Sequence, residues 1–378
     1  MRLNVTFQPR RRCLRPALSL SNGYTEDPDL SPKKPALRIT SRPASGIRCI
    51  IQAVLLCFLI SLSASAALAA PPTPQVNLLA MGDWGTNGDA QRSVARALVT
   101  YVSAANKPFD GMLLVGDNFY MTLPGGIHDP IWQSAFENMY DPHILSFPFY
   151  AVLGNHDYQS GKDAIELEYT RANPDSRWKL PARWYRVDFP ADHPLVTALM
   201  LDSDRDMLGI DRWQQEKIWL ANELVKPRGT WTLCCAHHPL FSNGGHGDNG
   251  ILQNDWGTLF QKYNVDFYIC GHDHDLQHLQ IPNWFTSFIM VGGGGADLKL
   301  MLHDSRGPMS RLTHGFGSFT FTPELATIQF TTVDGKTLHQ FTRDKSGKVD
   351  VQILGGNDKS AVNVLRALEG FGSSDESK

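Results

Sequence analysis

The chain of 378 residues has only six cysteines. Cys13, Cys49 and Cys57 fall within the first 70 residues, so three remain in the body of the chain: Cys234, Cys235 and Cys270. Three cysteines cannot complete a disulfide framework. Each lies in an apolar, strand-like run, and we interpret all three as small buried hydrophobic residues. A bridge between the adjacent cysteines is left open as an alternative.

Two catalytic signatures are also missing. The sequence has no Gly-x-Ser-x-Gly nucleophile elbow, so serine-hydrolase chemistry has no support. It has no Gly-x-x-x-x-Gly-Lys-Ser/Thr loop, which argues against kinase or ATPase chemistry. A run of four glycines, Gly292 to Gly295, follows an apolar strand-like run. We interpret it as a close backbone approach or a simple turn, not as a phosphate-binding loop.

Long apolar runs are scarce. Residues 1–70 hold ten Lys or Arg against three Asp or Glu, then an uncharged run from Ile50 to Leu62 and the small residues Ala67-Leu68-Ala69. This order is typical of a secretory signal, with cleavage near Ala69. The run is shorter than the roughly 20 residues of a membrane span, and a retained anchor is the alternative. We therefore expect a targeting segment at 1–69, a catalytic domain at 70–350 and a mobile tail at 351–378.

Basic clusters are lacking after the leader. Of the 35 basic and 38 acidic residues of the chain, 25 and 35 remain beyond residue 70, a net charge of −10. Nucleic-acid binding relies on clustered Lys and Arg, so a nucleic-acid partner is not expected. We also expect no stable membrane association after cleavage, and a monomer.

Five short motifs place carboxylates, amides and imidazoles directly after predicted strands. Side chains in that position lie at the carboxyl edge of a sheet, where open α/β sheets bind ligands. Oxygen and nitrogen donors without thiolates suit iron, manganese or zinc. Two such ions can clamp a phosphoryl group and acidify a bound water. The motifs are Gly82-Asp83-Trp84-Gly85, Gly116-Asp117-Asn118-Phe119-Tyr120, Gly154-Asn155-His156-Asp157, Ala236-His237-His238-Pro239 and Gly271-His272-Asp273-His274.

Hydrophobic periodicity predicts a mixed α/β protein. Early strands alternate with helices, which predicts parallel crossovers, and a later cluster of strands predicts an antiparallel part. The expected helices are 90–102, 130–139, 212–224 and 253–263. The expected strands are 76–81, 112–115, 149–153, 184–189, 196–201, 230–236, 265–270, 285–291, 316–321, 326–332 and 338–342.

Over roughly residues 76–345 these motifs resemble the metallophosphoesterases, and specifically the purple acid phosphatases of the small, mammalian tartrate-resistant type. The resemblance implies a four-layer αββα sandwich with a dinuclear metal site at the strand carboxyl ends. It implies that one metal, expected to be ferric, is held by Asp83, Asp117, Tyr120 and His274. Asp117 would bridge to a divalent iron, zinc or manganese, whose other ligands would be Asn155, His237 and His272.

Two further histidines are expected outside the metal ligands. His156 and His246 would bind phosphate and protonate the leaving oxygen, since imidazole titrates near neutral pH. Asp157 is expected to orient His156 from behind. His238 occupies a position that is usually aromatic in the family, and we assign it no direct role. We expect His272 and His274 to point the same way from an extended segment.

The sequence therefore predicts a secreted or periplasmic acid phosphatase. A metal-bound hydroxide would attack phosphate monoesters in line, with no covalent intermediate. Small phosphate esters, phosphoproteins and phytate-like compounds are the candidate substrates. The alternatives are a phosphodiesterase or nucleotide pyrophosphatase on the same site, and an iron protein of redox or phosphate-binding function.

Overall fold

The computed structural model describes residues 73–302, 306–353 and 355–357. The predicted targeting segment at 1–69 lies outside these residues. The predicted tail at 351–378 begins inside strand β15 (Val349–Ile353), and residues 358–378 are not described. Among the described residues, none of the helices combines the length and apolarity that a membrane crossing needs.

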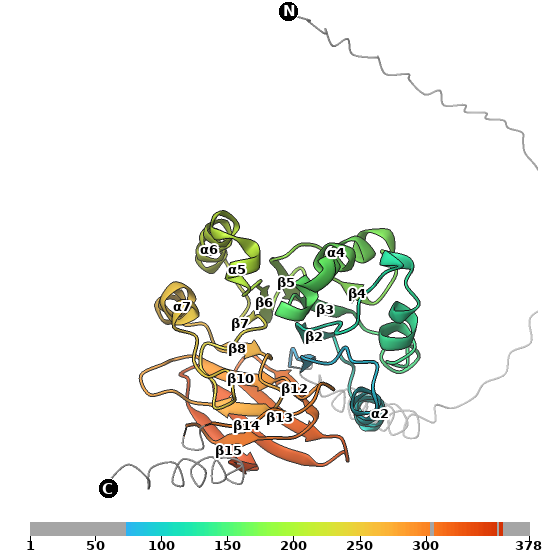
Figure 1. Cartoon of the computed structure of the whole chain (residues 1–378). Helices are drawn as coiled ribbons and strands as arrows, with labels where there is room; N and C mark the ends of the chain where they lie inside the picture. Colours follow the sequence, from blue (N-terminus) through green and yellow to red (C-terminus); the bar gives the residue numbers. More distant parts are fainter. Residues whose placement is uncertain (1–72, 303–305, 354, 358–378) are drawn as a thin grey trace, which may run out of the picture. The chain divides into compact units, whose positions relative to one another are not determined.

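Two eight-stranded sheets form the centre of the fold (Figure 1). In the first sheet a parallel half, β1 to β4, is joined to an antiparallel half, β12 to β15, through the pairing of β1 with β12. Its order is β15-β14-β13-β12-β1-β2-β3-β4. Its strands are β1 (Val76–Met81), β2 (Gly111–Val115), β3 (Phe149–Val152), β4 (Trp178–Lys179), β12 (Gly315–Phe321), β13 (Leu325–Thr332), β14 (Thr337–Asp344) and β15.

The second sheet has a parallel centre, β6-β7-β8-β10, with antiparallel neighbours on both sides. Its order is β16-β11-β9-β10-β8-β7-β6-β5. Its strands are β5 (Tyr185–Phe189), β6 (Val196–Met200), β7 (Trp231–Cys235), β8 (Phe267–Cys270), β9 (Leu276–Leu279), β10 (Ser287–Val291), β11 (Met309–Arg311) and β16 (Gly356–Asn357).

Helices cover the outer faces of the two sheets, which gives the four expected layers. The helices over the first sheet include α2 (Asp89–Ala104) and α4 (Lys162–Ala172), and those over the second include α6 (Ile210–Val225) and α8 (Thr258–Tyr263). Helix α2 buries residues spaced by three and four, the pattern that predicted it. The other helical segments are η1 (Gly126–His128), η2 (Trp132–Glu137), α3 (Asn155–Tyr158), η3 (Gln159–Gly161), α5 (Arg205–Leu208), α7 (Gly250–Leu252) and η4 (Gln253–Gly257).

Strand alternation separates the two hydrophobic layers around the second sheet. Cys235 packs in the core shared with the first sheet, whereas Cys234 packs in the cluster beneath α6 and α8. Successive strand side chains point to opposite faces. The two cysteines therefore face apart, and the structure has Cys234, Cys235 and Cys270 as free, buried thiols. The interpretation as small buried hydrophobic residues is confirmed, and the bridge is excluded.

Several elements of the structure differ from those expected from the sequence. Helix α4 was not expected, because charged residues interrupt its apolar spacing. The short strands β4, β9 and β11 were missed, since two to four residues carry little periodicity. The expected helix at 130–139 contains the π-helical turn η2, in which Trp132 and Phe136 are buried.

A pair of buried histidines is among the polar contacts that join the two sheets. His278 of β9 lies with its Nδ1 2.9 Å from Nε2 of His339 in β14, and its ring stacks on Phe341 with centroids 3.7 Å apart. Burial lowers the pKa of His278 well below its ordinary value and lowers that of His339 to about 4. Both rings are therefore neutral in the folded protein at mildly acidic pH.

This pair should make the fold sensitive to acid. Below about pH 6.5 these histidines become protonated in the unfolded chain but stay neutral in the folded protein. The free energy of unfolding therefore falls as the pH drops from about 6.5 toward 4. We expect the free energy of unfolding of His339→Gln to fall less on acidification than that of the wild type, by on the order of 2 kcal/mol. Thermal unfolding of both proteins at pH 6.5 and 4.5 measures it. The exposed His193→Gln should behave as wild type, and equal acid losses in the wild type and His339→Gln would contradict the assignment.

Candidate metal centre

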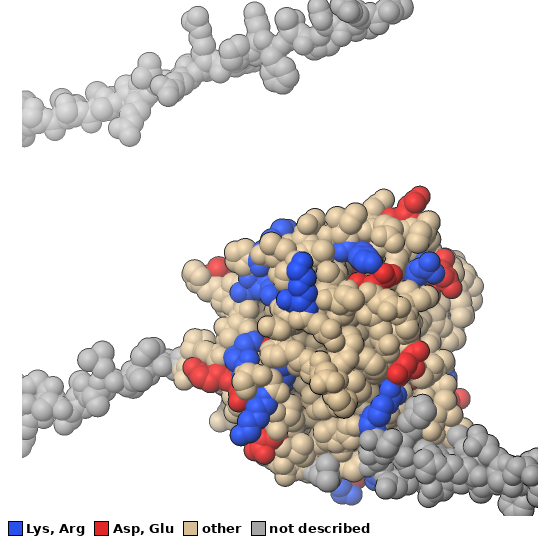
Figure 2. Space-filling model, turned by 90° about the vertical axis from the view of Figure 1, so that its left-hand side faces the viewer, with Lys and Arg blue, Asp and Glu red and all other residues tan. Residues whose placement is uncertain are grey.

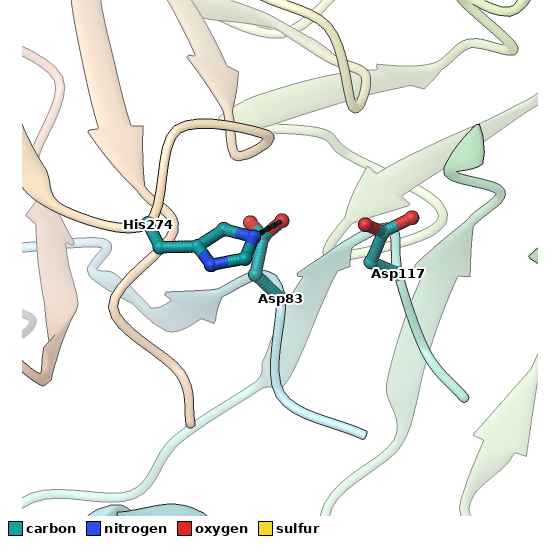
Figure 3. Close-up of side chains that lie close together, drawn as sticks. All are labelled: Asp83, Asp117 and His274. Atoms are coloured by element: carbon teal, nitrogen blue, oxygen red, sulfur yellow. Dashed lines mark ion pairs between the residues drawn. The ribbon is translucent and has the colours of Figure 1, made fainter. Parts of the chain in front are cut away.

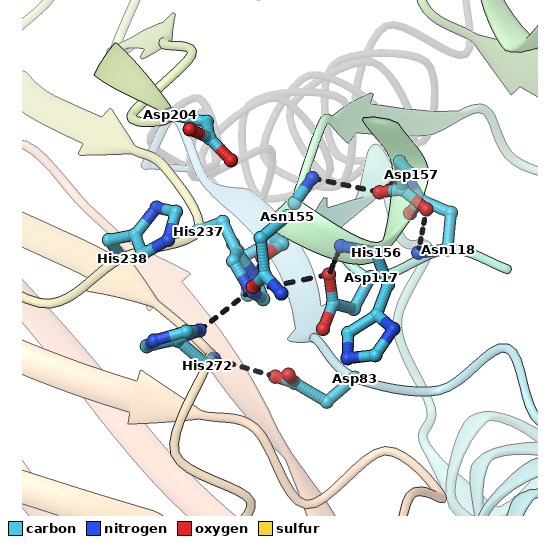
Figure 4. A network of polar contacts seen from close by, with 12 residues as sticks. Asp83, Asp117, Asn118, Asn155, His156, Asp157, Asp204, His237, His238 and His272 are labelled. Atoms are coloured by element: carbon cyan, nitrogen blue, oxygen red, sulfur yellow. Dashed lines mark hydrogen bonds and ion pairs between the residues drawn. The ribbon is translucent and has the colours of Figure 1, made fainter. Parts of the chain in front are cut away.

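The predicted site residues lie together at one edge of the two sheets. Each follows the carboxyl end of a parallel strand, β1, β2, β3, β7 or β8, as the motif positions predicted. Asp83, Asp117 and His274 offer ligand atoms that all lie within 4.8 Å of one another (Figure 3). Asn155, His237 and His272 lie beside them (Figure 4), and the Tyr120 hydroxyl contacts Asp117 and His274.

The backbone at these strand ends is unusual. Asp83, Asp117 and His272 have φ values of 57°, 51° and 73°. Side chains other than glycine rarely adopt this left-handed region, and such strain is typical of functional sites. The expected extended segment for His272 and His274 is wrong for this reason, since β9 begins only at Leu276 and His272 lies in a bend.

Glycines permit the loops to approach this closely. A Cβ atom on Gly116, which has a φ of 89°, would lie 2.7 Å from Nδ1 of His237. One on Gly292 would lie 2.0 Å from the carbonyl oxygen of Asp273 and 2.9 Å from Oδ2 of Asp83. The four-glycine run thus serves close backbone packing beside the site, the first of the two interpretations offered for it.

Asp83 and Asp117 are fully buried, and the side chain of each accepts one backbone amide. Asp117 Oδ1 accepts the His156 amide at 2.9 Å, and Asp83 Oδ2 accepts the His272 amide at 2.9 Å. Burial raises the pKa of Asp83. At Asp117 burial acts in the same direction, but His237 and His156 outweigh it and the pKa is lowered. Two adjacent buried carboxylates favour a nearby cation.

Three acceptor atoms converge beside Asp117. His237 Nδ1 lies 2.9 Å from the carbonyl oxygen of Val115, so the ring donates there and leaves a lone pair on Nε2. That Nε2 lies 3.1 Å from Oδ1 of Asn155, 3.2 Å from Nδ1 of His272 and 3.4 Å from Oδ1 of Asp117. Acceptor atoms brought this close repel one another unless a cation or proton lies among them. The geometry therefore fits a metal ion.

A second set converges around Tyr120. Its hydroxyl donates to Oδ2 of Asp117 at 3.1 Å and lies 3.2 Å from Nε2 of His274, whose Nδ1 donates to the carbonyl of Asp297 at 2.5 Å. Nε2 of His274 lies 3.4 Å from Oδ1 of Asp83. Burial, then the charges of Asp83 and Asp117, raise the pKa of Tyr120 far above its ordinary value. A phenolate forms here only if a cation offsets those charges.

The outer histidines flank the site on opposite sides. The ring of His156 lies against Tyr120, with centroids 4.5 Å apart, and burial lowers its pKa. The ring of His246 lies against His272 at 3.9 Å. Each adjoins its own surface hollow, of about 520 Å³ beside His156 and about 400 Å³ beside His246.

Asp157 has a different role from the one predicted. Within the described residues, no hydrogen bond joins it to the His156 ring. It is fully buried and accepts the amides of Asn118, Phe119 and Gly154 at 2.8, 3.1 and 2.8 Å. It therefore ties the loop after β2 to the loop after β3. Burial, followed by the charge of Asp117, raises its pKa to about 7.

Two residues that hydrogen-bond histidines around the site were not predicted from the sequence. Asp273 Oδ1 accepts from the amide of His246 and lies 2.8 Å from its Nδ1, which fixes the ring orientation. Ser203 Oγ lies 2.8 Å from Nδ1 of His238, whose ring is 4.4 Å from that of His272. The spacing of Asp273 between two predicted ligands could have signalled its role, whereas no local signal marks Ser203.

The chain is similar to known phosphoesterases. The family model of calcineurin-like phosphoesterases matches residues 76–276. Mouse tartrate-resistant acid phosphatase type 5 is 30% identical over 303 residues, covering 71% of this chain and 90% of the relative. Purple acid phosphatase 7 of Arabidopsis thaliana is 28% identical over 296 residues, covering 71% and 86%.

Solved structures support the fold. A purple acid phosphatase from yellow lupin seeds superposes with a TM-score of 0.56 at 18% identity, covering 72% of this chain and 54% of that one. GAP50 of Plasmodium, described as the anchor in the inner membrane complex, superposes with a TM-score of 0.62 at 20% identity, covering 79% and 94%. At these identities the likeness concerns the fold alone.

Replacing Asp117 should empty the centre. Asp117→Asn keeps the side-chain shape but removes the charge that faces both groups of donors. Loss of outer partners alone costs metal sites about 10–100-fold in affinity, so we expect a loss of at least about 100-fold. Metal content per chain after dialysis, measured by mass spectrometry, reports it. The exposed Asp211→Asn should retain its metal, and full occupancy of Asp117→Asn would refute the proposed ligand role.

Proposed function

Because this chain belongs to the calcineurin-like phosphoesterase family and is a metal-dependent phosphatase of the purple acid phosphatase type, we propose that it is an exported enzyme that hydrolyses phosphate monoesters. The observation that supports the proposal most is the meeting of Asp83, Asp117 and His274 with Tyr120 at one sheet edge. Export rests on the composition of residues 1–69. Acid to neutral conditions are proposed for its activity, in keeping with the acid phosphatases named among its relatives.

We propose that the family's dinuclear centre holds ferric iron and a divalent iron, zinc or manganese ion in this chain. Asp83, Asp117, Tyr120 and His274 would hold the ferric ion. Asn155, His237 and His272 would complete the second site, with Asp117 shared between the two. When bound, the two ions would neutralise phosphate charge and acidify a water.

The protein groups would position the ester and move its proton. His156, beside Tyr120, would hold the phosphate from one side. His246 would protonate the departing oxygen from the other side, since Asp273 anchors its Nδ1 and fixes the direction in which the rest of the ring faces. Asp157 would act at a distance by keeping the loops of Asp117 and Asn155 in register.

The distribution of surface charge indicates which kinds of substrate the protein can bind. On the face shown in Figure 2, lysine and arginine side chains stand among acidic ones instead of forming a continuous band. We propose small phosphate esters or phosphoproteins as substrates.

The colour of the purified protein tests the ferric site. Phenolate bound to ferric iron absorbs visible light, so the wild type should be violet and contain iron. Tyr120→Phe should lose the visible band while keeping its fold, because it removes one oxygen from a packed ring. The absorption spectrum and metal analysis of both proteins measure this. A colourless wild type loaded with manganese or zinc would reject the iron assignment.

The leaving-group dependence of the rate tests His246. A proton donor matters most when the leaving oxygen is strongly basic. His246→Asn should therefore lower kcat about 10²–10⁴-fold for an alkyl phosphate and much less for p-nitrophenyl phosphate. The exposed His193→Asn serves as the control. An equal loss on both esters would remove the proton-donor role.

A second comparison separates the enzyme classes. The wild type should prefer p-nitrophenyl phosphate over bis(p-nitrophenyl) phosphate, and His156→Ala should lower that activity. Preference for the diester would favour a phosphodiesterase. An unchanged principal activity in His156→Ala would favour a redox or phosphate-binding protein.

A further inference from the structure

The hollow beside His156 extends beyond the space that one phosphate group needs. Its volume is about 520 Å³, and Tyr120, His156 and His274 line its inner end. Its other walls come from two segments, Thr86 to Ala90 at the start of helix α2 and Gly295 to Lys299 after strand β10. Lys299 is the only lysine or arginine among its lining residues.

The segment that carries Lys299 is fixed at both ends. On one side the amide of Ala296 donates to the carbonyl of Asp83 at 2.8 Å, and the carbonyl of Asp297 accepts from His274. On the other side the amide of Leu302 donates to the carbonyl of Asn243 at 2.8 Å. Lys299 is half-buried between the exposed Leu298 and Leu300. The lysine is therefore held at the wall of the hollow.

The ammonium group of Lys299 supplies positive charge at the wall of this hollow. Among the described residues it makes no ion pair or hydrogen bond. Of the two carboxylates in the hollow, Asp89 is paired with Arg92 at 3.2 Å, while Asp297 is exposed. A half-buried ammonium group that has no partner among the described residues attracts an anion more strongly than one in open water.

We propose that Lys299 binds a second anionic group, a carboxylate or a further phosphate, on the organic part of the substrate. The proposal rests on the phosphatase function above. The scissile phosphate lies among the predicted metal ligands, and the remainder of the ester extends along the hollow to the lysine. Lys299 thereby favours doubly anionic esters over neutral ones.

Kinetics on matched substrates test this. Lys299→Met removes the charge and keeps the length of the side chain. We expect KM to rise about 10-fold or more for pyrophosphate and for 4-carboxyphenyl phosphate, with kcat little changed. For p-nitrophenyl phosphate, which has no second anion, both constants should stay within about 3-fold. Lys299→Arg should restore most of the difference, and the exposed Lys348→Met should match the wild type.

The two anionic substrates distinguish the sources of the second charge. If KM rises only for pyrophosphate, the second anionic group is a phosphate. If KM rises only for the carboxylated ester, that group is a carboxylate. Either result supports the proposal. An equal loss on all three substrates would assign Lys299 to the scissile phosphate and overturn it. No loss on any substrate would also overturn it.

A binding measurement separates this proposal from the proposed function. Titration calorimetry of the metal-loaded protein with pyrophosphate and with inorganic phosphate requires no turnover. Lys299→Met should weaken pyrophosphate binding and leave phosphate binding unchanged, even if the wild type hydrolyses no ester. Equal affinities of the wild type and Lys299→Met for pyrophosphate would refute the role of Lys299 without affecting the proposed phosphatase function.

Discussion

The site depends on the crowding of electron-rich atoms around two buried carboxylates. Asp83 and Asp117 are buried, and the lone pairs of His237 and His274 face them because backbone carbonyls bind the opposite nitrogen of each ring. Burying like charges without compensation is costly. Two cations reverse the sign of this cost, since every donor then faces a positive charge. The same crowding that disfavours the empty centre gives it affinity for metal.

The scaffold sustains that crowding through backbone geometry. Parallel strands from both sheets end at the same edge, and three of the residues that follow them have left-handed backbone angles. Glycines at the neighbouring positions admit the loops to contact distance. Asp157 then fastens two of these loops by accepting three backbone amides. Rigid elements with such supporting bonds hold metal ligands more accurately than free loops do.

Much of this arrangement could be predicted from the sequence, because a strand followed by glycine and a polar residue is a local pattern. That pattern placed Asp83, Asp117, Asn155 and His237 correctly at strand ends, and the αββα layers are confirmed. The partner of His246 was not predicted, since a hydrogen bond between residues 27 positions apart depends on how two loops pack. The same limit explains the error at Asp157, because no local sequence pattern marks its bonds to three backbone amides and to the Asn118 side chain.

The hydrogen bond from His274 to the carbonyl of Asp297 limits which sequence changes can alter the specificity of this protein. The segment that shapes one wall of the hollow beside His156 also sets the angle of the His274 imidazole. An insertion or deletion near Asp297 would shift that ring as well as the wall. New specificities are therefore more accessible through exchanges of side chains at positions 298 to 300 than through remodelling of the main chain, which would put the inorganic centre at risk.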